Sequence, residues 1–162
     1  MKINENIIWD LLRLSLSFIF LWVFFDKLFG LGFSTGASKS WLAGVSPTTG
    51  FLANAPDGPL APIFNSLSGN ILVDLLFMGG LFLVGSALLL GIGMKIAGYC
   101  GALMMFLIYL SLFPPENNLL IDEHTVYIII LIGLVIRGEK QKFGFGKKWS
   151  EVKLVKKYSI LQ

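Results

Sequence analysis

Residues 71–111 decide the fold, and they read ILVDLLFMGGLFLVGSALLLGIGMKIAGYCGALMMFLIYLS. Two long apolar runs flank the short turn at residues 91–95. The hydrocarbon core of a bilayer needs about 20 apolar residues of helix to cross it, so each run predicts a membrane-spanning helix. The short turn makes the pair an antiparallel hairpin, in which small residues let the two backbones approach closely. These small residues are Gly79, Gly80, Gly85 and Ser86 in the first run and Ala97, Gly98, Gly101 and Ala102 in the second.

Two further segments are apolar and long enough to cross a membrane, which gives four predicted spans at 7–29, 71–93, 96–113 and 119–136. The chain is 55% hydrophobic with a mean hydropathy of +0.75, which excludes an ordinary soluble domain. We therefore expect an all-α membrane protein, with a four-transmembrane-helix bundle over residues 1–137. Residues 31–70 are long and apolar for a linker, and they predict a structured extracytoplasmic loop that caps the outer end of the bundle.

The basic residues concentrate in the last part of the chain. Residues 137–162 hold eight basic and two acidic side chains, while the whole chain carries only +3. The positive-inside rule then places both termini in the cytoplasm, with residues 138–162 as a basic cytoplasmic tail. Such a tail beside a membrane span predicts the anionic lipid bilayer as its partner rather than nucleic acid. Its aromatic residues suit a segment that lies in the headgroup layer.

The single cysteine, Cys100, excludes a disulfide within the chain and a dithiol redox pair. It stands among small residues at positions 97–102. We therefore predict that Cys100 is a buried packing residue.

Ionisable residues gather at one end of the four predicted spans. A charge inside hydrocarbon costs several kcal/mol unless it is paired or hydrated, so such residues indicate a functional site. Six residues belong to this group: Asp26, Lys27, Asp74, Asp122, Glu123 and His124.

Helix length decides which of these charges lie within the membrane. Only twelve residues separate His124 from Arg137, which is roughly 18 Å of helix. His124, together with Glu123, is therefore expected below the outer surface. Tyr127 shares the face of His124, and the pair suits a proton relay or a hydrogen-bond donor to a quinone carbonyl. The same argument applies to the first span, in which twelve residues separate Arg13 from Asp26.

Structural interpretations stand beside the functional ones. Asp122 is suited to cap a helix N-terminus, and Asp74 follows a cap at Asn70. Arg13 can pair with Asp10, and Lys27 with Asp26. A metal site is the weaker alternative, because its ligands would come from separate helices with no spacing motif.

Several motifs, taken in order and spacing, resemble one family of small membrane proteins over about residues 10–137. They are RLSLSF at 13–18, DKLFG at 26–30, GVSPTTGFL at 44–52, GPL at 58–60, Asp74 with the glycine-rich stretch 79–98, and DEHTVY at 122–127. The chain resembles the DoxX superfamily, and within it the DoxD-like subunit of thiosulfate:quinone oxidoreductase.

This resemblance implies an archaeal-type subunit of the plasma membrane that oxidises thiosulfate to tetrathionate and reduces a quinone. The resemblance implies a second small subunit as partner, and a second copy of the chain is the alternative. The sequence contains no haem, flavin or iron–sulfur motif, and we predict no metal. The alternative is a non-catalytic scaffold or assembly subunit of a membrane complex.

The predicted site lies between the first and last spans, with the long loop as its lid. Proton transfer is assigned to His124, Asp26, Glu123 and Asp74, and the binding of thiosulfate or the quinone ring to Lys27, Arg13, Lys39, Tyr127 and Trp22.

Overall fold

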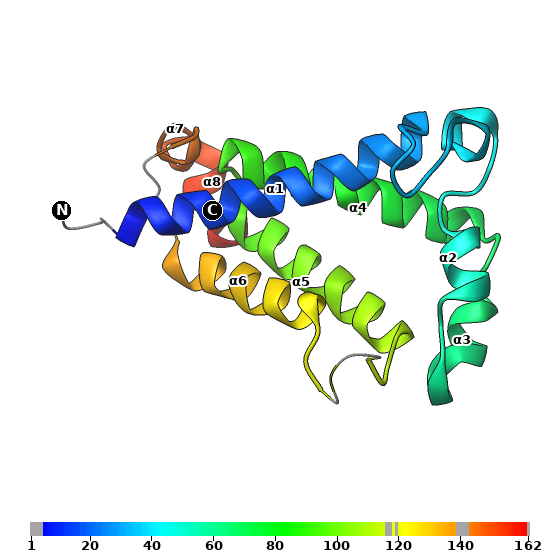
Figure 1. The fold of residues 1–162 in the computed structure, drawn as a ribbon. Coiled ribbons are helices and arrows are strands. Elements are labelled where there is room, and N and C mark those ends of the chain that lie inside the picture. Colours follow the sequence, from blue (N-terminus) through cyan, green and yellow to red (C-terminus); the bar gives the residue numbers. More distant parts are fainter. Residues whose placement is uncertain (1–4, 116–117, 119, 139–142, 162) are drawn as a thin grey trace.

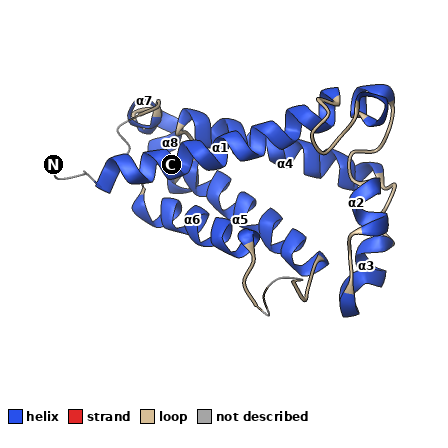
Figure 2. Ribbon diagram, viewed as in Figure 1, coloured by secondary structure: helices blue, strands red, loops and turns tan. Residues whose placement is uncertain are grey.

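The computed structural model describes residues 5–115, 118, 120–138 and 143–161, and these residues form helices, turns and loops without a strand (Figure 2). Four helices are long. They are α1 (Glu5–Phe29), α4 (Ile71–Leu90), α5 (Met94–Ser111) and α6 (Glu123–Arg137). The short helices and 3-10 turns are η1 (Ala37–Lys39), η2 (Trp41–Ala43), α2 (Thr49–Asn54), η3 (Gly58–Leu60), α3 (Ala61–Asn65), α7 (Gly146–Ser150), α8 (Lys153–Lys157) and η4 (Ser159–Leu161).

Three helices, α1, α4 and α5, are long and apolar enough to cross a membrane. The described residues form no strand, so the all-helical prediction is confirmed for them. Helix α6 has 15 residues, or about 22 Å of rise, and begins at Glu123 rather than at residue 119. Its start is set by Asp122, whose carboxylate accepts a hydrogen bond from the Thr125 backbone N–H at 3.0 Å.

The long helices pack mainly as two pairs, α1 with α4 and α5 with α6, and the α4–α5 hairpin joins the pairs. Figure 1 shows the pairs close together where α1 begins and farther apart where α1 ends. We call these the tail end and the loop end. At the tail end α1 reaches α6, because the Trp9 ring lies against Gly133 and Arg137 donates a hydrogen bond to the Asn6 side chain.

The small residues serve different contacts from those expected. A methyl group at Gly98 would collide with Val135 of α6, and one at Gly85 would lie 2.8 Å from Leu21 of α1. Gly79 has no neighbouring atom within 4 Å of such a methyl group. Close approach therefore occurs between α5 and α6 and between α1 and α4, as well as across the hairpin.

The prediction for Cys100 is wrong, because its side chain is exposed. At 100° per residue, Cys100 lies 200° around α5 from Gly98. It therefore shares the outward side of the helix with Tyr99 and Leu103, which are also exposed.

The 31–70 loop and the tail, which contain only short helices and turns, both fold onto the long helices. Gly58, at the start of η3, has a positive φ of 71°, and an added Cβ would lie 2.5 Å from the Phe113 carbonyl oxygen. The 31–70 loop therefore reaches from α1 and α4 to the end of α5. The tail packs at the opposite end, where the Phe145 N–H donates to the Leu90 carbonyl at 2.7 Å and Val155 is fully buried. Residues 139–142 and 162 of the predicted tail lie outside the described residues.

Candidate functional site

Helix α6 begins with a hydrogen-bonded pair formed by Asp122 and His124. One carboxylate oxygen of Asp122 accepts from the Thr125 backbone N–H at 3.0 Å, and the other lies 2.7 Å from Nδ1 of His124. The two side chains are only 12% and 16% exposed, respectively. The cap of the helix therefore also fixes the imidazole ring.

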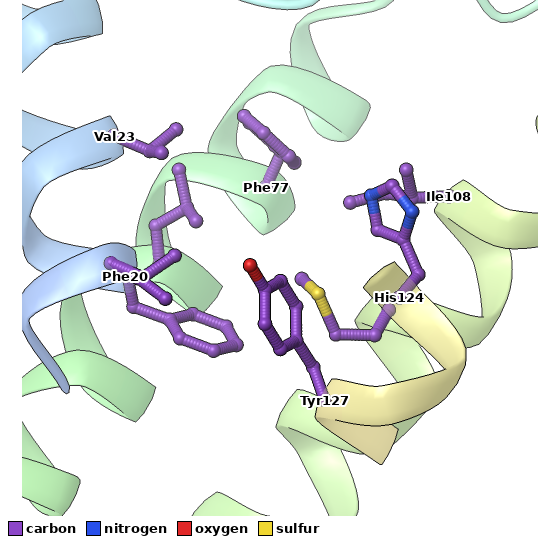
Figure 3. Close-up of a pocket in the computed structure, with 9 residues that line it drawn as sticks. Phe20, Val23, Phe77, Ile108, His124 and Tyr127 are labelled. Atoms are coloured by element: carbon purple, nitrogen blue, oxygen red, sulfur yellow. The ribbon is translucent and has the colours of Figure 1, made fainter. Parts of the chain in front are cut away.

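The ring of His124 faces a cavity of about 200 Å³ between the two helix pairs. Figure 3 shows His124 and Tyr127 projecting from α6 toward side chains of α1 and α4. Apart from these two residues the lining is apolar. It consists of Ile19, Phe20 and Val23 from α1, Phe77 and Leu81 from α4, and Met105 and Ile108 from α5.

The cavity exists because the pairs separate toward the loop end. Phe20 and Leu81 line the cavity and also belong to the buried core, so the cavity lies directly beside tightly packed side chains. Val23 lies only three residues before Asp26, about 4.5 Å along the helix axis. His124, which lines the cavity together with Val23, therefore lies near the level of the last two turns of α1.

This arrangement suits a flat apolar ring that carries a polar edge. Nonpolar walls favour the ring, and the imidazole and phenol groups offer hydrogen bonds to an oxygen atom. Figure 3 places Phe20 and Tyr127 on neighbouring sides of the space. Aromatic rings in such positions can contact a bound ring by offset or edge-to-face packing.

Asp26 does not line the cavity, although it is only 1% exposed. Its two oxygens accept hydrogen bonds from the backbone N–H groups of Phe33 and Ser34 at 3.2 and 3.0 Å, and from the Ser34 hydroxyl at 2.7 Å. Trp22, one turn earlier, packs against the Phe33 ring with 4.9 Å between centroids. Both predicted site residues therefore hold the start of the loop against α1.

Lys27 and Asp74 hold one short stretch of the same loop from two helices. The Lys27 amine donates to the Pro47 carbonyl at 3.0 Å. The Asp74 carboxylate accepts from Ser46 at 2.8 Å and from Thr48 at 2.5 Å. We call residues 46–48 the clamped segment. Lys39 is exposed in η1 and has no contact with the cavity.

Arg13 lies at the tail end, far from His124. It is fully buried and donates to the carbonyls of Leu88, Leu89 and Phe143, the last at 2.9 Å. Its Nε lies 3.8 Å from an Asp10 oxygen, which agrees with the ion pair weighed from the sequence. Arg13 therefore joins the end of α4 to the tail.

Three potential metal-ligand atoms, from Asp122, Glu123 and His124, lie within 4.8 Å of one another. Unlike the sequence expectation, they come from consecutive residues rather than from separate helices. Glu123 is exposed, and both Asp122 oxygens already have partners in Thr125 and His124. The donor set is therefore occupied by the helix cap and the imidazole pair.

The structure thus brings together His124 and Tyr127 of the predicted site, and adds three features. Phe20 and Phe77 line the cavity, and Asp122 binds His124. The Asp-x-His spacing at the start of a helix was a usable signal, because a capping carboxylate has a second oxygen free. No sequence signal marked the two phenylalanines among the many in the chain.

No family model, no curated protein and no solved structure matches the chain. The function proposed below therefore rests on the residues, their geometry and the resemblance noted in the sequence.

Proposed function

We propose that this protein is a multi-pass membrane protein of DoxX type that binds a quinone in the cavity beside His124. The observation that carries the proposal is a hydrogen-bonded imidazole facing an apolar cavity of about 200 Å³. A dry cavity of about 150 Å³ accommodates benzene, so this one has room for a quinone ring. Its walls come from the four long helices α1, α4, α5 and α6.

In this proposal α6 is the fourth crossing, and both termini lie on the cytoplasmic side of the plasma membrane. The described tail supports that orientation, because Lys147, Lys148, Lys153, Lys156 and Lys157 are all exposed at the tail end. Exposed apolar side chains, including Phe143, Phe145 and Leu154, accompany these lysines. A surface of this composition fits anionic headgroups and the acyl boundary beneath them.

Within the cavity, His124 donates a hydrogen bond to a quinone carbonyl and transfers a proton as the quinol forms. Tyr127 contacts the same oxygen or the ring. Quinol formation takes two electrons and two protons, and the His124 ring, which is 16% exposed, is protonated again from water to transfer the second proton. In the reaction that the resemblance implies, two thiosulfate ions give one tetrathionate and release those two electrons.

The charges support a second subunit for the thiosulfate half of the reaction. Thiosulfate is a dianion, but the Lys27 amine donates to Pro47 and Arg13 lies at the tail end. Lys39 is exposed on the loop and is available to a dianion that approaches with a partner. We therefore assign quinone binding to this chain and thiosulfate binding to its contact with a partner subunit.

Quinone binding is tested by titrating the purified protein in nanodiscs with a short-chain quinone. Val23→Phe fills the cavity from α1, and it should weaken binding at least tenfold. Val126→Phe makes the same change on the exposed side of α6, outside the cavity lining, and it should leave the Kd unchanged. Equal affinities for both variants, or no binding by the wild type, would contradict the proposal.

The thiosulfate half is tested in membranes that contain the whole complex. Thiosulfate-dependent quinone reduction should be lost in His124→Gln while the amount of assembled complex is unchanged. A His124→Gln complex with full turnover would remove this histidine from the reaction.

A non-catalytic scaffold is the second candidate, and the charged residues favour it. Asp26, Lys27, Asp74 and Arg13 all bind loop or tail groups within the described chain. A scaffold predicts that changes at these residues lower stability and recovery of a partner. It also predicts that quinone does not bind, which the Val23→Phe and Val126→Phe titration decides.

A further inference from the structure

We propose that Asp122 is a positioning residue that fixes the tautomer of His124 and presents Nε2 to the cavity. This inference rests on the proposed quinone site, and it assigns to Asp122 a role beyond capping α6. The evidence is the double use of one carboxylate: Oδ1 lies 3.0 Å from the Thr125 backbone N, and Oδ2 lies 2.7 Å from Nδ1 of His124.

An ionised carboxylate only accepts hydrogen bonds, so the proton between Asp122 and His124 belongs to Nδ1. Nε2 then has a lone pair when the ring is neutral and a proton when the ring is charged. Figure 3 shows the imidazole on the side of the cavity near Phe77 and Ile108. In its protonated form His124 therefore donates through Nε2 to a carbonyl in the cavity, and in its neutral form it accepts the proton of a quinol hydroxyl.

The carboxylate is itself held in place by its second use. Oδ1 also lies 3.2 Å from the Thr125 hydroxyl, which gives this oxygen two donors from one residue. The start of α6 thus orients the carboxylate, and the carboxylate orients the ring. The other charges near the site are Glu123, which is exposed on the same helix, and the Lys27 amine, which lies 6.0 Å from the centroid of the Phe77 ring.

The chain contains one histidine, so a protein labelled with ring-¹⁵N histidine gives one pair of ring signals. The nitrogen that carries the proton is distinguished by its chemical shift. In full-length protein in nanodiscs without quinone, we expect the neutral ring to carry its proton on Nδ1.

Two substitutions separate orientation from capping. Asp122→Ser keeps a capping hydroxyl but is too short to reach His124, so the preference for the Nδ1 proton should be lost. Asp122→Asn also keeps the cap, and its amide N–H groups face the ring, so the proton should move to Nε2. Asp122→Ser, which leaves the ring unoriented, should bind short-chain quinone about tenfold more weakly with helix content unchanged. Asp122→Asn should retain quinone binding, because the Nε2 proton of the neutral ring then donates to the carbonyl.

Asp122→Ala removes both functions and serves as the comparison for loss of the cap. The inference is overturned if Asp122→Ser keeps the wild-type ring signals, or if quinone affinity falls only in Asp122→Ala. If the wild-type protein binds no quinone, the quinone site is refuted. If Asp122→Ser nevertheless loses the preference for the Nδ1 proton, the orientation of His124 by Asp122 still holds.

Discussion

Replacement of Asp74 by alanine should release the clamped segment, residues 46–48, from α4. Asp74 is 2% exposed and accepts hydrogen bonds from Ser46 at 2.8 Å and Thr48 at 2.5 Å. A hydrogen bond to a charged group contributes about 1.5–3 kcal/mol, so two of them contribute about 3–6 kcal/mol. Asp74→Ala should therefore lower the free energy of unfolding by at least about 3 kcal/mol.

The assay combines thermal unfolding in detergent with limited proteolysis of the 31–70 loop. Asp74→Asn keeps an acceptor oxygen without the charge, so it should fall between the wild type and Asp74→Ala. Asp57→Ala is the matched control, because Asp57 also caps a turn of the loop but is exposed. It should cause a much smaller loss. Equal stability of Asp74→Ala and Asp57→Ala would refute the clamp. Turnover that disappears in a fully stable Asp74→Asn protein would instead support the catalytic role predicted from the sequence.

Three further predictions concern packing and the tail. Gly98→Ala should destabilise the protein by about 1–3 kcal/mol, because its methyl group meets Val135. Gly79→Ala should be neutral or stabilising, because a methyl group there has no neighbour within 4 Å. Thermal denaturation compares the two variants. Arg13→Met should expose residues 143–161 to protease, because the Phe143 carbonyl loses its donor, and a wild-type cleavage rate would contradict that role. Cys100→Phe should be tolerated because Cys100 is exposed, whereas Ala102→Phe should lower thermal stability because Ala102 is buried, and equal losses would contradict the assigned faces.

Hydrophobic runs were sufficient to predict the long helices, because apolar length is what a membrane helix requires. The helix ends also followed from local chemistry. Asn70 and Asp122 cap α4 and α6 as the sequence suggested, and the glycines of the 91–95 turn adopt positive φ. The sequence did not show which helices approach one another most closely. Small residues show that close approach is available, but only the fold shows that Gly98 meets α6.

The candidate site was predicted in part, for a similar reason. The short distance between His124 and Arg137 predicts the depth of His124 in the membrane, because helix rise is fixed, and that depth stays a prediction. Asp26, Asp74 and Arg13 are all buried, but the sequence argument on depth covered only the span of Arg13 and Asp26. Their partners were not predictable, because these are loop and tail groups distant in sequence: Ser34, Thr48 and Phe143. Buried charge can indicate a bound ligand or a structural connection, and composition does not distinguish these.

The central claim is that a quinone ring binds beside His124, and photolabelling tests it most directly. A short-chain azidoquinone is irradiated with the protein in nanodiscs, and the labelled peptides are identified by mass spectrometry. We predict labelling of Met105 and Tyr127, which line the cavity from two helices, and its loss in the presence of excess unmodified quinone. Labelling that appears only on the lipid-exposed surface, and that unmodified quinone does not reduce, would contradict the claim.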